Sequence, residues 1–221
     1  MGEATDAREL TASRIPARRL EAENLHLWRG ERHVLRGVAF TLSSGECLQV
    51  VGANGAGKTT LLRTVAGLMY PEEGQVRWDG ADVRRDLRTF HAAILYLGHE
   101  PPLKADLTAR ENLHYWIGTR RRLPAEALAA ALSRVGVGAL GERLVRTLSA
   151  GQRRRVALAA LTLSLASLWL LDEPTTNLDS EGQELVGTLL AEHLAEGGLA
   201  LAAVHHELPR AVRGARRLEL T

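Results

Sequence analysis

The feature that most constrains this chain is a run of eight residues that fits the pattern G-x-x-x-x-G-K-[ST]. The run reads Gly52-Ala53-Asn54-Gly55-Ala56-Gly57-Lys58-Thr59. Its three glycines let successive backbone N–H groups turn toward a phosphate, where side chains would block the approach. Lys58 adds a cation for the β- and γ-phosphates, and the Thr59 hydroxyl can ligate the Mg²⁺ that accompanies them. The octapeptide therefore predicts a nucleotide-phosphate site, with a chance glycine-rich turn as the alternative.

The segments on either side of this run have the character that a phosphate loop needs. Residues 47–51 are apolar and predict a buried strand, in which Cys47 packs as a small hydrophobic side chain. Residues 60–69 predict a helix, whose positive N-terminal end faces the same anion. Strand, loop and helix thus follow one another in the order that phosphate binding requires.

Length and composition indicate one domain, with room for an inserted subdomain. The chain has 221 residues, of which 45% are hydrophobic, and this is enough for a large core. Its formal net charge is only +2 and its aromatic content only 4%, which argues against nucleic acid as a partner. The arginine clusters at residues 120–122 and 153–155 are therefore interpreted as solvated faces of helices or loops. A single cysteine, Cys47, excludes an internal disulfide.

The N-terminal residues differ in character from the rest of the chain. Residues 1–19 mix Glu, Asp and Arg without an apolar centre, so we expect a flexible leader rather than a signal peptide. No run of about 18 apolar residues is free of charge, so no membrane-spanning helix is predicted. Residues 20–221 are expected to form the folded domain.

Alternating and apolar runs outline that domain as an α/β structure. Strands are predicted at residues 20–27, 34–42, 47–51, 75–78, 93–97, 168–171, 199–204 and 217–220. Helices are predicted at residues 60–69, 108–116, 124–135, 149–165 and 180–196. This order predicts a nucleotide-binding α/β core that is interrupted by a helical insertion at about residues 99–150.

A second chemical feature follows the apolar run 168–171, which ends in two carboxylates, Asp172 and Glu173. Asp172 can hold Mg²⁺ beside the phosphate loop. Glu173 is then placed to orient and deprotonate an attacking water. A solvated acidic turn is the alternative for these two residues alone, but the phosphate loop upstream favours the catalytic interpretation.

A second candidate anion site lies at the start of the predicted helix 149–165. It consists of Leu148-Ser149-Ala150-Gly151-Gln152, in which Ser149 and the amides after it form a helix N-terminus. One chain needs only one phosphate cradle to bind one ATP. The second cradle therefore indicates that it serves a neighbouring copy of the chain.

The order of the phosphate loop, Leu-Ser-Ala-Gly-Gln and Leu-Leu-Asp-Glu-Pro resembles that of the ATPase subunits of ABC transporters, over about residues 20–221. The resemblance implies an ABC ATPase cassette, in which an α/β P-loop NTPase (RecA-like) core carries an antiparallel β subdomain and the helical insertion. It implies ATP and Mg²⁺ as ligands, and a head-to-tail homodimer in the ATP-bound state. Each ATP would lie between Gly52–Thr60 of one subunit and Ser149–Gln152 of the other. Asp179 would lie at the dimer interface.

The same resemblance assigns roles to further residues. His205, with His206 as the alternative, would contact the γ-phosphate. Trp28 is the nearest candidate for the aromatic side chain that stacks on adenine, although it would also be unremarkable as a core or surface residue. His99, followed by Glu100, stands where the family usually has a glutamine, so His99 is a candidate Mg²⁺ ligand with Thr59 and Asp172. The predicted catalytic residues are Lys58, Glu173 and His205.

Within this family, three segments resemble the ATP-binding subunits of cytochrome c maturation systems, which power haem export or the release of a haem chaperone. These segments are residues 95–104, 107–113 and 148–159, while Glu100 and Thr175–Asn177 depart from that subfamily's usual residues. The resemblance implies integral membrane subunits as partners and a peripheral place at the cytoplasmic face of the bacterial inner membrane. It also implies that a partner helix docks near His99–Lys104 and the helical insertion. No Cys-x-x-Cys-His occurs and the histidines are scattered, so we expect no direct haem binding.

Three other functions are alternatives. The first is the ATPase subunit of another small-substrate or multidrug exporter. The second is an ABC protein that acts on ribosomes or DNA, but such chains generally carry two cassettes or a long coiled coil, and this chain has neither. The third is a small-molecule P-loop kinase, which would leave Leu148–Gln152 unexplained and would turn over only with an acceptor.

Overall fold

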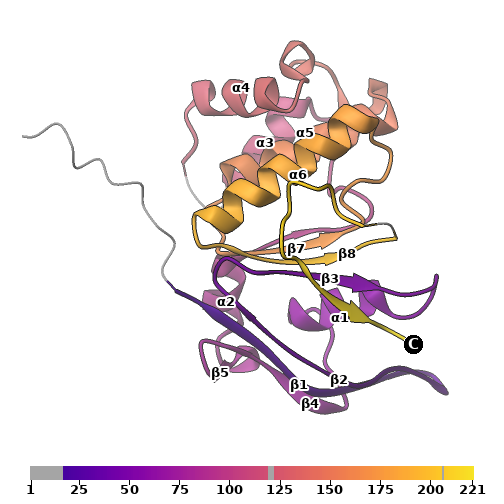
Figure 1. The fold of residues 1–221 in the computed structure, drawn as a ribbon. Helices are drawn as coiled ribbons and strands as arrows, with labels where there is room; N and C mark the ends of the chain where they lie inside the picture. The colour runs from indigo at the N-terminus through magenta and orange to yellow at the C-terminus, as the bar shows by residue number, and fades with distance from the viewer. Residues whose placement is uncertain (1–16, 119–121, 206) are drawn as a thin grey trace, which may run out of the picture.

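Two β-sheets organise the computed structural model, which describes residues 17–118, 122–205 and 207–221 (Figure 1). The predicted leader and the alternative His206 therefore lie outside the described residues, apart from residues 17–19. One sheet is antiparallel with the strand order β2-β1-β4-β5, and the other is parallel with the order β6-β7-β8-β3-β9. The antiparallel sheet consists of β1 (Arg19–Arg29), β2 (Arg32–Ser43), β4 (Glu73–Trp78) and β5 (Ala81–Asp82). The parallel sheet consists of β3 (Cys47–Val51), β6 (Ile94–Leu97), β7 (Leu168–Asp172), β8 (Leu199–Ala203) and β9 (Arg216–Glu219).

Helices cover both faces of the parallel sheet. Two of them, α1 (Lys58–Val65) and α2 (Leu87–Ala93), lie between the two sheets (Figure 1). On the opposite face lie α5 (Ala150–Leu163) and α6 (Ser180–Ala195), and α3 (Ala109–Gly118) and α4 (Ala125–Arg134) pack against α5 (Figure 1). Short 3₁₀ helices occur at Val83–Arg85, Gly138–Leu140 and Val145–Thr147.

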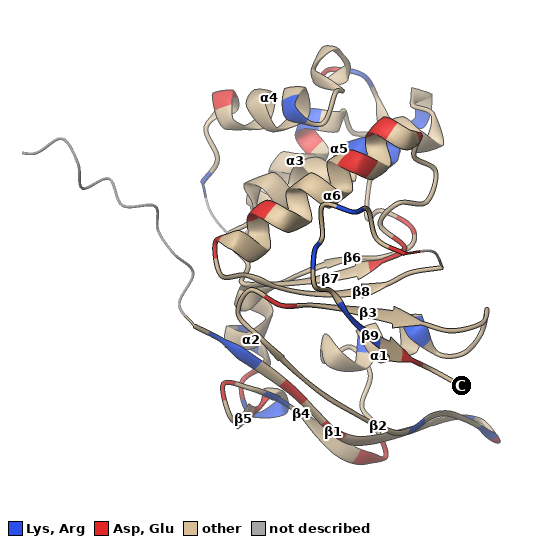
Figure 2. Ribbon diagram, in the orientation of Figure 1, with Lys and Arg blue, Asp and Glu red and all other residues tan. Residues whose placement is uncertain are grey.

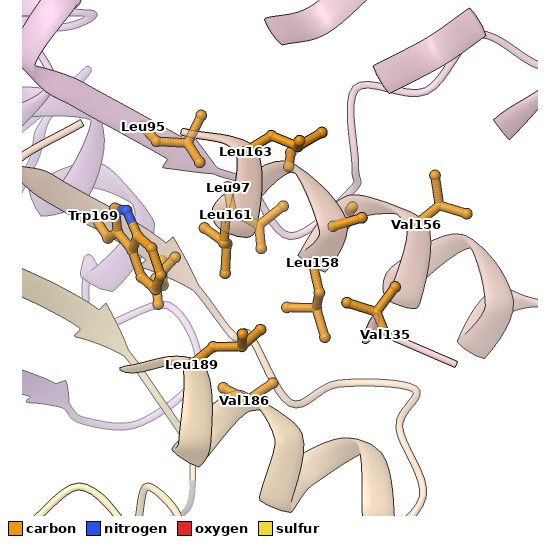
Figure 3. Packing of buried hydrophobic residues seen from close by; sticks show 14 of the residues in the cluster. Leu95, Leu97, Val135, Val156, Leu158, Leu161, Leu163, Trp169, Val186 and Leu189 are labelled. Atoms are coloured by element: carbon orange, nitrogen blue, oxygen red, sulfur yellow. The ribbon is translucent and has the colours of Figure 1, made fainter. Parts of the chain in front are cut away.

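The parallel strands are buried on both faces, so their alternate residues belong to different hydrophobic clusters. Leu168 and Leu170 of β7 pack with α1 and the antiparallel sheet, whereas Trp169 and Leu171 pack toward α5 and α6. Figure 3 shows the second of these clusters, in which Leu158 of α5 lies among side chains of the sheet and α6. This burial on two sides holds the carboxyl ends of the strands, from which the candidate site is built.

Cys47 begins β3 and is a core residue, as its apolar neighbours predict. Its side chain is buried, and burial raises the pKa of the thiol to about 12. The cysteine is therefore a neutral packing group at physiological pH.

Every predicted strand and helix occurs, with shifts at their ends. The largest shift concerns α1, which was predicted at residues 60–69 but spans Lys58–Val65. Gly57 precedes it with a φ of 105°, and Gly67 beyond its end has a φ of 70°, so two left-handed glycines set its limits. Neither β5 nor α2 was predicted from the sequence. The start of α2 has a recognisable signal, because Asp86 accepts a hydrogen bond from the backbone N–H of Thr89 at 3.0 Å.

Charged residues of both signs are distributed over both sheets and the helical layer (Figure 2). Among the described residues, no helix combines the length and the hydrophobicity needed to cross a bilayer.

Candidate functional site

The phosphate-loop motif lies between β3 and α1, as predicted, and two of its glycines are required by close neighbours. A Cβ atom on Gly52 would lie 2.6 Å from the carbonyl oxygen of Leu220. A Cβ atom on Gly57 would lie 2.8 Å from Cγ1 of Val34, and the φ of Gly57 is 105°. The loop is therefore packed against β2 and the C-terminal residues, so its backbone is fixed before any ligand binds.

Lys58, the first residue of α1, is buried although it carries a charge. Its Nζ donates hydrogen bonds to the carbonyl oxygens of Gly52 at 2.7 Å and Ala53 at 3.2 Å. The ammonium group is thus held at the loop itself. A phosphate bound by the loop amides would lie beside it.

Asp172 ends β7 and is only 1% exposed. Burial raises the pKa of its carboxyl group, and a hydrogen bond to Thr59 acts in the opposite direction. The Oδ2 atom of Asp172 is buried and has no hydrogen-bond partner among the described residues. A buried carboxylate oxygen without a partner, beside a threonine hydroxyl, is a donor set that fits Mg²⁺.

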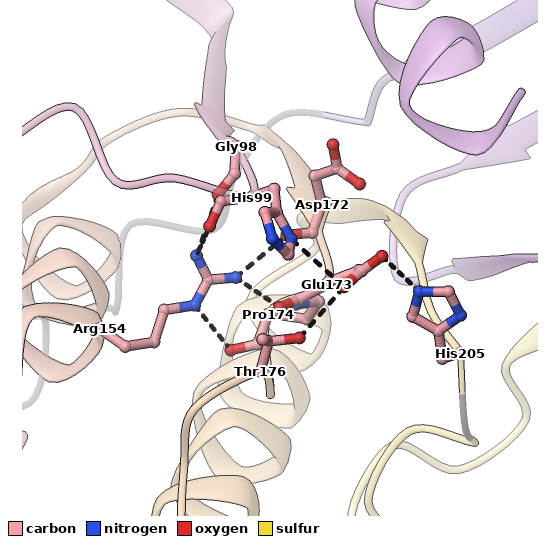
Figure 4. Close-up of polar contacts among 8 residues, drawn as sticks. All are labelled: Gly98, His99, Arg154, Asp172, Glu173, Pro174, Thr176 and His205. Carbon is pink, nitrogen blue, oxygen red and sulfur yellow. Dashed lines mark hydrogen bonds and ion pairs between the residues drawn. The ribbon is translucent and has the colours of Figure 1, made fainter. Parts of the chain in front are cut away.

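Glu173 follows Asp172 and is the centre of a network of polar side chains (Figure 4). Its Oε1 lies 2.5 Å from Nε2 of His205, and its Oε2 lies 3.2 Å from Nδ1 of His99. The hydroxyl of Thr176 donates to Oε2 at 3.2 Å. The backbone of Glu173 has a φ of 51°, a left-handed conformation that is uncommon for a residue other than glycine and is found at functional sites.

One cavity of about 600 Å³ joins these groups, a size that suits a small-molecule ligand. The cavity is lined by Arg29, Arg32, Val34, Asn54, Gly55, Gly57, Lys58, Thr59, Thr60, His99, Glu173 and His205. The structure thus brings together the predicted phosphate loop, the predicted catalytic residues and His99.

Trp28, the predicted adenine platform, is placed differently. Among the described residues, the wall of the cavity includes Arg29 and Arg32 but not Trp28. The Trp28 ring instead stacks on the ring of His33, with centroids 3.9 Å apart and an angle of 7° between the planes. Arg32 also donates a hydrogen bond to the carbonyl oxygen of Gly55 at 2.7 Å, which joins the β1–β2 connection to the phosphate loop.

The second predicted anion site, Ser149–Gln152, does not line this cavity in the described chain. It forms a capping box at the start of α5, in which the side chains of Ser149 and Gln152 each accept a hydrogen bond from the other's backbone N–H. Ala150 lines a separate cavity of about 450 Å³, together with His99 and Glu100. Of the two residues at the glutamine position, only His99 lines both cavities.

Asp179, the predicted interface residue, has two partners within the chain. It caps α6 by accepting from the backbone N–H of Gly182 at 2.9 Å, and its Oδ1 lies 2.8 Å from Nη2 of Arg155. Its side chain remains 67% exposed.

The interpretation of Arg153–Arg155 as a solvated face is wrong for this cluster. Arg154 is only 2% exposed, and its guanidinium donates to backbone carbonyl oxygens on either side of the candidate site (Figure 4). Arg155 pairs with Asp179, and Arg153 donates to the carbonyl oxygen of Leu148 at 2.6 Å. A run of three arginines has the composition of a solvated face, so the sequence carried no signal of this burial.

Comparison with known proteins agrees with this geometry. The ABC transporter family model matches residues 35–176. Among similar curated proteins, the cytochrome c biogenesis ATP-binding export protein CcmA of Salmonella typhi is 48% identical over 203 residues, which cover 91% of this chain and 97% of that protein. CcmA of Methylococcus capsulatus is 48% identical over 194 residues, which cover 87% of this chain and 93% of that protein.

Solved structures show the same fold. A dimeric ATP-binding cassette in a post-hydrolysis state, bound to ADP and Pi, has a TM-score of 0.80 and 25% identity, covering 91% of this chain and 94% of that one. An ABC transporter ATP-binding protein from Pyrococcus furiosus has a TM-score of 0.79 and 25% identity, covering 91% and 97%. These matches, with the phosphate loop and Glu173 meeting in one cavity, show that the chain belongs to the ABC transporter family and has its ATPase cassette fold.

Proposed function

We propose that this chain is the ATP-hydrolysing subunit of an ABC export complex in cytochrome c biogenesis. The observation that carries the proposal is the Glu173 carboxylate, which faces the cavity of the phosphate loop and is held between His205 and His99. The 48% identity to CcmA proteins over 91% of the chain supports the haem-related role within the wider family.

Each residue of the cavity has a task in this proposal. The amides of Gly52–Thr60 bind the phosphates, and Lys58 leaves its carbonyl partners to contact the β- and γ-phosphates. Glu173 orients a water and accepts its proton, while His205 and His99 hold the carboxylate and contact the γ-phosphate end. Water is the phosphate acceptor in this proposal, so the turnover is hydrolysis rather than transfer to a second substrate.

Mg²⁺ is the cofactor in this proposal, and the residues present fit it. Thr59 and Asp172 would hold the ion, with His99 as the third predicted ligand. Among the described residues, no group of three or more His, Cys, Asp and Glu side chains could hold a metal by itself. This agrees with an ion that arrives with substrate phosphates and keeps several waters. The bound ion supplies charge neutralisation for the phosphates.

A head-to-tail homodimer would complete the site. In this arrangement Ser149, Ala150, Gly151 and Gln152 of the partner subunit cover the nucleotide, and Asp179 lies at the interface. Two observations support it. Among the described residues, Ser149–Gln152 does not line the cavity of its own chain, and a cassette of similar fold is dimeric in its solved structure with ADP and Pi. Opening of the Ser149–Gln152 capping box would free the amides of α5 for the phosphate.

Membrane subunits of the cytochrome c maturation complex are the proposed partners, at the cytoplasmic face of the bacterial inner membrane. The domain would span residues 20–221, with residues 99–150 as the inserted helical subdomain that meets the partner. The cavity of about 450 Å³ beside Glu100, Pro101 and Leu103 supports docking at this place. Haem would contact the membrane subunits and not this chain.

A pull-down from membranes tests this proposal. Tagged full-length chain carrying Glu173→Gln should bind ATP without turnover and trap the closed dimer on its partners. Recovery of cytochrome c maturation subunits should depend on ATP. The matched control is Glu184→Gln, an exposed residue of α6, which should release its partners after turnover. Recovery of the subunits of another exporter would overturn the haem role, and an ATP-loaded variant that stays monomeric with and without partners would overturn the dimer.

A further inference from the structure

Arg154 is a buried charge that the proposed function does not use. Its side chain extends from the second turn of α5, is 2% exposed, and uses all five of its N–H donors (Figure 4). The acceptors are the backbone carbonyl oxygens of Pro174 at 3.1 Å, Gly98 at 2.9 Å, His99 at 3.3 Å, Asp172 at 3.0 Å and Glu173 at 2.5 Å.

These acceptors belong to two segments that are far apart in the sequence and adjacent in the sheet. One segment follows β6 and carries His99, and the other follows β7 and carries Asp172 and Glu173. The side chains of His99 and Glu173 meet each other at 3.2 Å. A single guanidinium thus joins the backbones of the two loops whose side chains form the candidate catalytic pair.

Burying a charged group costs free energy unless each of its donors has a hydrogen-bond partner. The five carbonyl oxygens must therefore be held in fixed positions around the Arg154 guanidinium. Burial lowers the pKa of Arg154 to about 10, and the neighbouring carboxylates Asp172 and Glu173 oppose this shift. The guanidinium therefore stays charged at neutral pH. Its strongest geometric constraint falls on Glu173, whose carbonyl oxygen it binds at 2.5 Å and whose φ is 51°. The bond favours this strained conformation over an extended one, which would aim the carboxylate elsewhere.

The helix that carries Arg154 begins at Ser149, the start of the segment that is proposed to cover the nucleotide of the partner subunit. Arg154 lies two positions after Gln152 on the same helix. In the proposed dimer, the N-terminus of α5 would contact the nucleotide that is bound by the partner subunit. The second turn of the same helix carries Arg154, which contacts Glu173 of its own chain. A rigid α5 would therefore connect that nucleotide with the catalytic carboxylate.

We propose that Arg154 is a positioning residue for ATP hydrolysis: it ties the loops of His99 and Glu173 to α5, so that the carboxylate is aimed only when α5 is in place. This inference rests on the proposed function and deepens it. Arg154 touches no substrate in this account and acts through Glu173.

The test compares full-length variants in steady-state ATP hydrolysis with Mg²⁺. Arg154→Met should lower kcat about 100-fold, the loss expected from a misplaced catalytic group, while KM for ATP stays within about threefold. Arg154→Lys keeps the charge but cannot span five carbonyl oxygens, and should lower kcat at least about 10-fold. The matched control is Leu158→Ala, one turn further along α5 in the core, which destabilises the helix without touching either loop. Its kcat should stay within about threefold of the wild type, below its melting temperature.

A double-mutant cycle separates positioning from a structural role. In single-turnover hydrolysis, adding Arg154→Met to Glu173→Gln should lower the rate by less than about threefold, because Arg154 acts through the carboxylate that is already lost. Multiplied effects would overturn the inference, as would a folded Arg154 variant with wild-type kcat. If neither Arg154 variant folds while Leu158→Ala does, the role is structural and the inference is also overturned. A wild-type chain without ATPase activity would instead overturn the proposed function, and the inference with it.

Discussion

The two ends of the candidate cavity are built by different layers of the fold. At the phosphate end, Lys58, Glu173 and His205 follow β3, β7 and β8, which are neighbours in the parallel sheet. At the other end, Arg29 is the last residue of β1 and Arg32 is the first residue of β2, and both are exposed. The first set is fixed by strands buried on two sides, and the second set is solvated. The difference indicates that the cassette places its chemistry where the backbone is rigid and leaves weaker, adjustable contacts to the β hairpin.

The largest expected effect falls on the phosphate end. Glu173→Gln removes the group that is proposed to accept the proton of the attacking water, so kcat for ATP should fall by about 10²–10⁴-fold. Binding of ATP should change by less than about threefold, because Glu173 faces the water and not the ground-state phosphates. Single-turnover hydrolysis and calorimetric titration measure the two quantities. A variant that lost binding as much as turnover would show that Glu173 contributes to the binding site itself.

Lys58 should behave differently from Glu173 although the two line the same cavity. Lys58→Met removes a cation that is proposed to contact phosphates in both the ground state and the transition state, so ATP affinity and kcat should both fall. Because the loss of one preorganised donor typically lowers the rate by about 10²–10³-fold, we expect a decrease of this size in kcat. Lys104→Met is the matched control, since the other lysine of the chain lies over the ring of Tyr115 outside the cavity. Equal ATP affinity in the two variants would contradict the role given to Lys58.

Asp172 allows a test of stability at the same end. Burial raises the pKa of its carboxyl group above the unfolded value, so the folded state binds a proton more tightly than the unfolded one. The contribution of Asp172 to the free energy of unfolding is therefore favourable at low pH, and it is lost as the pH rises through the raised pKa. At neutral pH the buried carboxylate is charged and destabilises the folded state. Asp172→Asn should raise the melting temperature at pH 7 by a few degrees, since 1 kcal/mol moves the midpoint by about 2–4 °C, and should abolish Mg²⁺-dependent hydrolysis. A lower melting temperature at pH 7 would contradict this account.

The same contrast explains how much of the molecule could be predicted from its sequence. The phosphate end was predicted because each part is a short-range signal: a glycine-rich loop after an apolar strand, and two acids after another. Glu173 and the phosphate loop line one cavity because parallel strands present their carboxyl ends at one edge of the sheet. The short strand β5 and the seven-residue α2 were missed, since their only strong signals are capping residues such as Asp86.

Long-range contacts were beyond the sequence. The arginines at residues 153–155 have the composition of a solvated face, and only the packing of α5 against two loop backbones makes Arg154 a buried group. The stacking of Trp28 on His33 depends on the register of β1 and β2, in which the two residues are opposite each other. Register across a hairpin is set by turn geometry and bulges, and several bulges interrupt this pair.

The smallest expected effect falls on the hairpin end, where Trp28 and Arg29 are the two candidates for contact with the adenine ring. Trp28 is the sequence-based candidate, but one face of its ring is covered by His33, whereas Arg29 lines the cavity. We expect Arg29→Ala to raise the Kd for ATP by about two- to fivefold, the value of an exposed cation–π contact of about 0.5–1 kcal/mol. Trp28→Ala should change the Kd by less than about twofold, and so should Arg217→Ala, an exposed arginine of β9 that serves as the control. Calorimetric titration of each variant with ATP measures the three Kd values and so ranks the effects. If Trp28→Ala has the larger effect, the indole is the adenine platform, and the hairpin end must rearrange on binding so that its second face enters the cavity.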